Sequence, residues 1–170
     1  MSAILFRTAH KKDVPSIWKL LQDAIYRRGI EGSNQWQDGY PNLDILEKDV
    51  ENEHGFVLTH KEQIVGYIAL LINDEPEYQR LEGQWKTNGD FVVFHRLAVS
   101  QQFLGKGLAK RLFLEVERFA FSRNIYSIKA DTNHDNKPML HLFDALGYTH
   151  CGRVYFRGSP REAYEKVLEK

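Results

Sequence analysis

The spacing of hydrophobic and polar positions along the chain predicts a mixed α/β fold. Apolar residues that recur every three or four positions predict four helices, over residues 13–29, 43–52 and 105–123, and between Asn136 and Gly147. Short apolar runs bounded by polar turns predict seven strands, over residues 3–8, 56–59, 64–72, 91–99, 126–131, 148–156 and 163–168.

The run from Phe91 to Val99 is almost continuously apolar, which is typical of a central strand covered on both faces. Because strand side chains alternate, His95 is expected to share a face with Leu97, with Arg96 on the other face. A glycine-rich helix and a further strand follow, so this part of the sheet is expected to be parallel. No linker, repeat or low-complexity segment is evident, and the pattern predicts one domain over residues 1–170.

The turn after this strand, Leu104-Gly105-Lys106-Gly107-Leu108-Ala109, is expected to open a helix near Gly105. The first amides of a helix lack intrahelical partners and lie at the positive end of its dipole, so they can bind an anion such as phosphate. Glycines at 105 and 107 let a bulky diphosphate approach the backbone. The spacing excludes a P-loop, because no hydroxyl residue follows Lys106, and a G-x-G-x-x-G fingerprint, because Lys110 replaces its last glycine. The glycines alone are equally compatible with an ordinary helix-start turn.

Charge and cysteine usage narrow the class of protein. Acidic and basic residues balance at 23 each, with no block of one sign, so the sequence offers no electrostatic footprint for nucleic acid or an anionic membrane. The one cysteine, Cys151, excludes an internal disulfide, and its flanks favour a packed thiol over a nucleophile. The N-terminus lacks the apolar core of a signal peptide, and the longest apolar run, Ile64 to Ile72, is too short to span a bilayer. We expect a cytoplasmic protein that binds neither nucleic acid nor membrane.

Three segments together resemble the GCN5-related N-acetyltransferase (GNAT) family: residues 94–109, Ala130-Asp131-Thr132, and the stretch from Asn136 through Gly147-Tyr148. In that family a Q/R-x-x-G-x-G/A turn binds the pyrophosphate of acetyl-coenzyme A (acetyl-CoA), and we place Leu104 at its Gln or Arg position. Because such a turn binds mainly through backbone amides, this departure is expected to weaken the site more than abolish it. The resemblance implies that acetyl-CoA contacts Leu97, Ala98, Val99, Leu104, Gly105, Lys106, Gly107, Leu108, Ala109, Asn136 and Phe143.

The same resemblance sharpens the predicted architecture. It implies an α/β (α+β) fold with a mostly antiparallel central sheet of about seven strands and a parallel crossover at its centre. About four helices flank this sheet. The implied order of elements is β-α-α-β-β-β-α-β-α-β-β.

His95 is the candidate catalytic base. A histidine on a buried strand is more often a hydrogen-bonded core residue, and spacing alone leaves that alternative open. The sequence His-x-Leu-Ala-Val at 95–99 is similar to the serotonin N-acetyltransferases. This resemblance implies that His95 helps to take a proton from the amine, and that a backbone N–H of residues 97–99 stabilises the oxyanion.

The candidate acid is less well defined. In the family pattern Asn-x-x-(Ala/Met)-x-x-x-Tyr, Asn136 and Met139 match, but the tyrosine position holds Phe143, which cannot donate a proton. Either another group such as Tyr148 supplies the proton, or none is needed. The second option is physically reasonable, because a thiol with a pKa of roughly 8.5 is a fair leaving group at neutral pH.

Two irregular stretches are candidates for the acceptor side. Trp36 and Tyr40 lie in the loop at 30–42, which borders the acceptor site in the resembled family, so both are substrate candidates. An equal alternative to a substrate role for Trp36 is that its side chain packs on the hydrophobic core beneath the loop. The segment 73–89 carries several acidic residues and no clear periodicity. It would favour a cationic acceptor if it covered the site, whereas a solvated surface loop is the simpler interpretation.

The chain is therefore expected to move an acetyl group from acetyl-CoA directly to a primary amine, with a small molecule as the preferred acceptor. An acyl-CoA-binding or sensing module with the same fold but no chemistry is the alternative, and a domain that acts only through partner contacts is a third. Metal catalysis is not indicated, because the seven histidines are scattered and His134 and His141 lack the i, i+4 spacing of a helical metal pair. The identity of the amine and the oligomeric state, a homodimer included, stay open.

Overall fold

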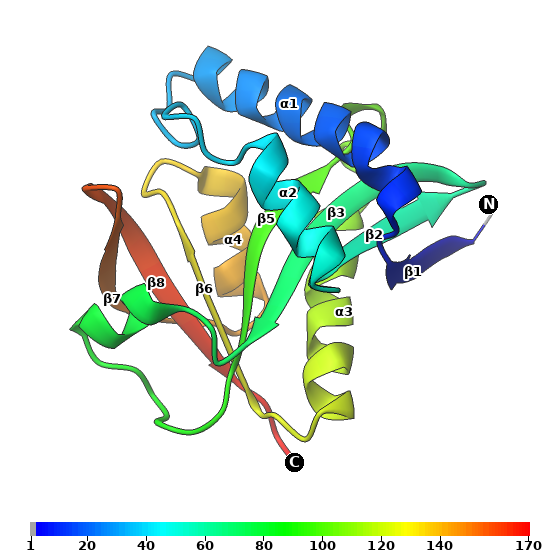
Figure 1. Ribbon diagram of the computed structural model, residues 1–170. Coiled ribbons are helices and arrows are strands. Elements are labelled where there is room, and N and C mark those ends of the chain that lie inside the picture. The colour runs from blue at the N-terminus through cyan, green and yellow to red at the C-terminus, as the bar shows by residue number, and fades with distance from the viewer. Residues whose placement is uncertain (1–2) are drawn as a thin grey trace. The chain divides into compact units, whose positions relative to one another are not determined.

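The computed structural model describes residues 3–170, so the first two residues of the predicted domain lie outside it (Figure 1). The described residues form a mixed fold with mostly antiparallel strands and one parallel pair, and the predicted fold class is confirmed. The helices are α1 (Val14–Ile30), α2 (Leu43–Glu51), α3 (Leu108–Ser122) and α4 (Lys137–Ala145). The strands are β1 (Ile4–Thr8), β2 (Gly55–His60), β3 (Gln63–Ile72), β4 (Glu82–Gly83), β5 (Val92–Val99), β6 (Ser127–Thr132), β7 (Thr149–Phe156) and β8 (Ser159–Val167).

The chain forms two compact units. The first contains the described residues up to Leu70 together with Arg96–Glu115, and the second contains Leu71–His95 and Val116–Lys170. The boundary passes through β5 and α3, so each of these elements contributes residues to both units. None of the helices in residues 3–170 has both the length and the apolar character that crossing a bilayer requires.

In the first unit, β1, β2 and β3 pair in antiparallel register, and α1 and α2 pack against them. The β2–β3 hairpin turns through Lys61 and Glu62, which both have left-handed backbones (φ 49° and 68°) as two-residue hairpin turns require. The apolar stripe predicted on the first helix is buried as expected. The buried core of the first unit consists of Ala9, Ile17, Leu20, Leu21, Ala24, Leu46, Val57, Tyr67 and Ala98.

In the second unit, β5 and β6 form the parallel pair, and β6, β8, β7 and β4 follow in antiparallel order. Phe143 of α4 is fully buried and packs against the ring of Phe94, with ring centroids 6.5 Å apart. Val93, whose side chain faces the opposite side of β5, packs with Tyr78 and Trp85 from the segment between β3 and β5. One face of this unit is therefore covered by a helix and the other by the 73–91 segment.

The helix after the glycine turn begins at Leu108, three residues later than the sequence predicts. Gly105 and Gly107 have left-handed backbones (φ 75° and 77°), which are incompatible with a right-handed helix. The helix ladder opens with the amide of Arg111 donating to the carbonyl of Gly107 at 2.9 Å. The two glycines thus form the turn before the helix and not its first residues.

The segment at 73–89 lies mostly at the surface, as its interpretation as a solvated loop predicts, but part of it is structured. It contains a 3-10 helix, Pro76–Arg80, and the two-residue strand β4, which pairs with β7. A Cβ atom on Gly83 would lie 2.1 Å from the carbonyl oxygen of Cys151, so glycine is required for this pairing. An element this short leaves no hydrophobic period in the sequence. The last hairpin is also tighter than predicted, because β8 begins at Ser159 and the turn holds only Arg157 and Gly158.

Glu165 on β8 fixes the segment before β5 to the sheet. Its side chain is fully buried and accepts the amide of Lys86 at 2.6 Å and that of Thr87 at 3.3 Å. The hydroxyl of Thr87 also donates to it, and Ser127 of β6 donates at 2.7 Å. A buried carboxylate is tolerated because these donors replace the water that it loses.

Replacing Asp13 with asparagine is expected to lower the free energy of unfolding by about 1–3 kcal/mol at neutral pH, because a buried charge-assisted pair is lost. The Asp13 carboxylate is 6% exposed and accepts from Arg7 at 2.7 and 3.1 Å and from the amide of His10 at 2.7 Å. The Arg7 hydrogen bond, opposed by burial, holds the pKa of Asp13 below its ordinary value. Its stabilising contribution is therefore complete above about pH 4 and is lost as the pH falls through the lowered pKa.

Chemical denaturation from pH 7 to pH 3 measures this effect. The difference in the free energy of unfolding between wild type and Asp13→Asn should become smaller as the pH approaches 3. Asp23→Asn is the matched control, because the Asp23 side chain is 56% exposed and lies 3.9 Å from Lys19. Asp23→Asn should change the free energy of unfolding by no more than about 0.5 kcal/mol. A gap for Asp13→Asn that is constant across this pH range would contradict the assignment.

Replacing Glu165 with glutamine is expected to destabilise the second unit by about 1–3 kcal/mol and to speed amide exchange at Lys86 and Thr87. Glu165 accepts these two amides at Oε1 and two hydroxyls at Oε2, whereas glutamine has no charge and only one accepting oxygen. Hydrogen exchange followed residue by residue measures it. Glu162→Gln is the control, since Glu162 lies on the same strand but accepts from His150 and Arg153. Unchanged protection of the Lys86 and Thr87 amides in Glu165→Gln would show that other contacts hold the segment.

Candidate active site

The glycine turn at 104–107 is exposed, and the structure leaves room beside it. A Cβ atom on Gly105 or Gly107 would meet no heavy atom within 4 Å. The amides before Arg111 in the first turn of α3 precede the helix ladder and have no intrahelical acceptor. The amides of residues 108–110, which lack an intrahelical acceptor, lie at the positive end of the helix beside two glycines and fit the diphosphate of a coenzyme A group. The amides of Leu104 and Lys106 already donate to the carbonyls of Gln101 and Phe103.

The position of the glutamine in this turn needs correction. In a Q/R-x-x-G-x-G/A pattern the first residue lies three positions before the first glycine, and that position is Gln102. The pattern is therefore complete, and Leu104 is not a departure from it. Gln102 lies in the 3-10 turn Gln101–Phe103, and its side chain accepts from Gln63 at 3.4 Å.

Arg96 interrupts the regular alternation of β5. Its backbone is left-handed (φ 56°), which is uncommon for a residue with a side chain and marks a local distortion of the strand. Its guanidinium makes two bonds to Asp49, at 2.7 and 2.8 Å, and donates to the hydroxyl of Tyr40 at 2.6 Å. Although burial opposes it, the proximity of Tyr40 and Asp49 holds the pKa of Arg96 above its ordinary value, so Arg96 is a permanent cation. The simple alternation expected along residues 95–99 is thus wrong at Arg96.

The parallel strands of the second unit are paired over only a short distance. In the described residues the ladder between β5 and β6 covers Val92 with Ile128 and Val93 with Lys129. Beyond these pairs β6 continues to Thr132, bonded to β8 on its other side. His95 and Asp131 therefore follow the point at which the two strands stop pairing.

His95 forms a close pair with Glu75, a residue of the segment between β3 and β5. The Nε2 atom of His95 lies 2.7 Å from Oε2 of Glu75, and the two side chains are only 14% and 12% exposed. An ionised carboxylate can only accept, so this contact assigns the proton to Nε2. Nδ1 is then the basic nitrogen of the neutral ring. The rings of Tyr78 and Phe156 lie 6.4 and 6.3 Å from it and hold the imidazole in place.

Asp131 of β6 lies beside His95 and Tyr78. Its Oδ2 atom accepts from the hydroxyl of Tyr78 at 2.6 Å, and the Tyr78 side chain is almost fully buried. Burial raises the pKa of Asp131, and His95 and the Tyr78 hydrogen bond act in the opposite direction. Glu75, Tyr78, His95 and Asp131 thus form one continuous polar cluster within the second unit.

Tyr148, the candidate acid, lies elsewhere in this unit. Its ring packs against Phe143 with centroids 5.1 Å apart, and Phe143 in turn packs against Phe94. Phe94 and His95 are neighbours on a strand and point to opposite faces. Tyr148 is therefore on the face opposite to His95, and the structure does not bring the two candidates together. Burial raises the pKa of the Tyr148 phenol well above its ordinary value.

The remaining predicted residues have mainly packing or capping contacts. Trp36 is partly buried and packs against the core of the first unit, as the alternative interpretation of this residue predicts. Asn136 caps α4, because its side chain accepts the amide of Met139 at 3.4 Å and donates to Thr132 at 3.1 Å. Cys151 is buried, and this burial raises the pKa of its thiol, which disfavours a nucleophilic thiolate.

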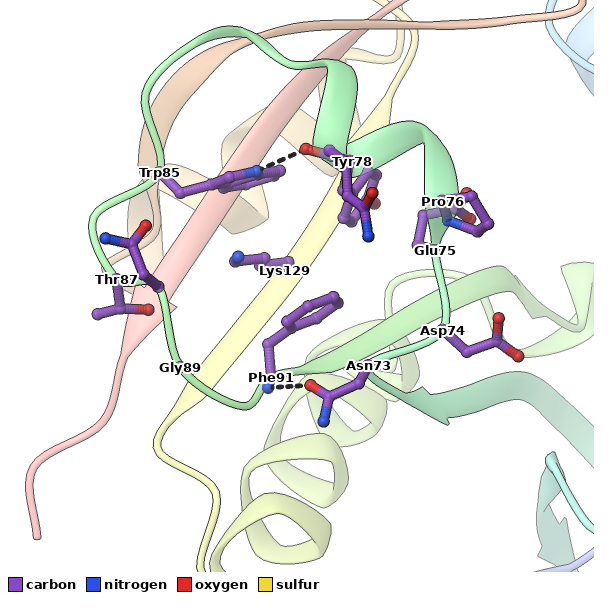
Figure 2. A pocket seen from close by; sticks show the side chains of 12 residues that line it. Asn73, Asp74, Glu75, Pro76, Tyr78, Trp85, Thr87, Gly89, Phe91 and Lys129 are labelled. Carbon is purple, nitrogen blue, oxygen red and sulfur yellow. Dashed lines mark hydrogen bonds between the residues drawn. The ribbon is translucent and has the colours of Figure 1, made fainter.

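A cavity of about 250 Å³ lies in the second unit, between the 73–91 segment and β6 (Figure 2). The rings of Tyr78, Trp85 and Phe91 and the side chain of Lys129 line it, and Glu75 connects it to His95. In residues 3–170 no group of three or more histidine, cysteine or acidic side chains is arranged to hold a metal ion.

Sequence reasoning missed Glu75, Tyr78, Asp131 and Lys129 as individual site residues. Glu75 and His95 are 20 positions apart and belong to no shared motif. The one available signal was the cluster of acidic residues at 74–82 in a loop too long to be a simple connection.

Comparison with known proteins identifies the family of this chain. Residues 15–148 match the acetyltransferase (GNAT) family. A GNAT-family acetyltransferase from Streptococcus agalactiae is 33% identical, with a TM-score of 0.88 over 98% of this chain and 96% of that one. A putative acetyltransferase from Staphylococcus aureus is 26% identical, with a TM-score of 0.74 over 97% and 99% of the two chains. The uncharacterized N-acetyltransferase YesJ of Bacillus subtilis is 28% identical over 83% of this chain and 79% of its own length. The chain therefore belongs to the acetyltransferase (GNAT) family and is an acyltransferase.

Proposed function

We propose that this protein transfers an acetyl group from acetyl-CoA to the primary amine of a small molecule, with His95 as the base. The observation that carries the proposal is the 2.7 Å contact between His95 and Glu75 at the point where β5 and β6 stop pairing. The polar cluster around this contact also supplies a place where a cationic amine is favoured, because Glu75 is acidic and largely shielded from water.

An amine can attack a thioester only after losing its proton. A primary amine with a pKa near 10.4 is almost wholly protonated at pH 7, so a base at the site is needed. Nδ1 of His95 accepts the proton while Nε2 keeps its bond to Glu75. The Glu75 carboxylate then stabilises the positive imidazolium that forms, as the carboxylate does in other histidine-carboxylate pairs.

The donor supplies a thioester acyl group, and the backbone amides of the turn at 104–109 would hold its diphosphate. During the transfer a C–N bond forms and the C–S bond breaks, with its electron pair leaving on the sulfur. The nitrogen loses its second proton to water as the amide forms. A thiolate of pKa about 8.5 leaves readily at neutral pH, so the mechanism needs no acid. Tyr148 accordingly has no part in it.

His95→Ala is expected to lower kcat for amine acetylation at pH 7 by about 10²–10⁴-fold, the usual contribution of a positioned base. Its residual rate should rise about tenfold per pH unit up to pH 9, because the fraction of free amine rises in that proportion. Glu75→Gln keeps the size of the side chain and removes its charge, so it should lower kcat by a smaller factor. Thiol release followed from pH 6 to pH 9 measures both variants.

His150→Ala is the matched control for this experiment. His150 forms another histidine-glutamate contact, at 3.0 Å to Glu162, but its side chain is 53% exposed on β7. The kcat of His150→Ala should equal that of the wild type. If His95→Ala retains the wild-type rate and pH profile, His95 is not the base.

Gly107→Glu is expected to abolish binding of acetyl-CoA measured by isothermal titration, because it places bulk and negative charge beside the turn amides. Gly158→Glu is a close control. Gly158 has the same backbone angle (φ 77°), and open space surrounds it in the same way, but it lies in the β7–β8 turn. Equal loss of binding in the two variants would mean that backbone strain, and not the phosphate site, is responsible.

A further inference from the structure

Lys129 of β6 extends into the cavity of the second unit, between two aromatic rings (Figure 2). Its Nζ atom lies 4.4 Å from the ring centroid of Trp85 and 4.3 Å from that of Phe91. The residue is only 4% exposed. The indole N–H of Trp85 donates to the carbonyl of Tyr78 at 2.9 Å, so the ring above the ammonium is held in position.

Within residues 3–170 the Lys129 ammonium donates no hydrogen bond, and no carboxylate lies within 4.0 Å of it. Two ring faces offset part of the cost of burying a charge, but they cannot accept all three N–H bonds. Burial accordingly lowers the pKa of Lys129, and Glu165 opposes this change from a greater distance. Glu165 itself is already bonded to Lys86, Thr87 and Ser127. An anionic group in the cavity would supply the acceptor that the protein does not.

The lining of the same cavity also carries negative charge. Asp74 and Glu75 line it together with Lys129, and Glu75 is the residue that bonds to His95. Apolar surface from Tyr78 and Phe91 separates these charges along the wall. A ligand that suits this lining has a cationic group for the carboxylates and an anionic group for the ammonium.

We propose that the acceptor is a small amino acid, that is, an amine that also carries a carboxylate. Lys129 binds the carboxylate between Trp85 and Phe91, and the amine lies at Glu75, beside the base. This assignment rests on the proposed function, because it names the acceptor of that reaction. A cavity of about 250 Å³ has room for on the order of eight water molecules at ~30 Å³ each, which matches a molecule of this size.

The test compares amines in matched pairs that differ only by a carboxylate. The pairs are alanine and ethylamine, β-alanine and ethylamine, 4-aminobutyrate and propylamine, and lysine and cadaverine. KM and kcat for each are measured by thiol release with acetyl-CoA, and binding of the four amino acids is measured by calorimetry without a donor. In wild type, at least one amino acid should have a KM tenfold or more below that of its partner amine.

Lys129→Met replaces the ammonium side chain with an uncharged, apolar side chain of similar length. It should raise the KM of that amino acid at least tenfold, change its kcat little, and leave the KM of the partner amine unchanged. Lys129→Arg restores the charge and should recover part of the affinity. Lys166→Met is the control, because Lys166 does not line the cavity and its ammonium donates to Glu117 at 3.1 Å. The kinetics of this variant should match those of the wild type.

The outcomes separate this inference from the function on which it rests. Equal KM values within every pair in wild type, or an equal rise of both members in Lys129→Met, would overturn the amino acid assignment while acetyl transfer stands. Amino acid binding that is lost in Lys129→Met, with no thiol release for any amine, would support the carboxylate site and overturn the transferase proposal for this cavity. If Lys129→Met does not fold, the wild-type pairs and Lys129→Arg decide the question.

Discussion

The buried carboxylate of Glu165 is the contact on which the second unit depends most. It binds two successive amides and a hydroxyl of the segment before β5, and a hydroxyl of β6. The other contacts of the segment at 84–89 are few, because β4 is only two residues long and Trp85 donates one hydrogen bond to the carbonyl of Tyr78. The anchor positions Trp85 against Tyr78, and Tyr78 in turn lies beside His95 and bonds to Asp131. One buried charge thus orders a loop that carries the polar cluster.

The buried charges of this unit are satisfied to different degrees within the fold. Glu165 has hydrogen-bond donors at both oxygens, so its burial is compensated within the fold. Lys129, two strand positions from Ser127, has ring faces in place of acceptors. A charge that the fold itself does not satisfy is costly to maintain, and such groups concentrate at binding sites.

The sequence predicted most of the fold because its elements have strong local signals. The helical stripe on α1, the continuous apolar run of β5 and the glycine turn before α3 all appear in the structure. The start of α3 was misplaced because a left-handed glycine and a helical glycine look the same in a sequence. β4 was missed because its pairing depends on the close approach of Gly83 to Gly152 of β7, which is a tertiary requirement with no periodicity.

The candidate site was predictable only where a motif carried it. His95 and the turn at 104–109 belong to stretches with a recognisable pattern, so the sequence alone made them candidates. Glu75, Asp131 and Lys129 come from separate elements, and only the folded chain brings them to His95 or to the cavity. Trp36 packs against the core of the first unit, and the Tyr40 hydroxyl accepts from Arg96, while the role of both residues toward a substrate stays a prediction.

This difference follows from what each part of the protein must recognise. A diphosphate is the same in every donor molecule and is bound by backbone amides, so glycine spacing is enough to encode its site. An acceptor differs from one enzyme to another and is recognised by side chains placed by a long segment such as 73–91. Changes in that segment can alter the acceptor while β5 keeps His95 and the strand at 97–99 in one continuous element. On the proposed assignment, the cavity recognises the acceptor through Lys129 and Glu75, which no short motif of the sequence brings together.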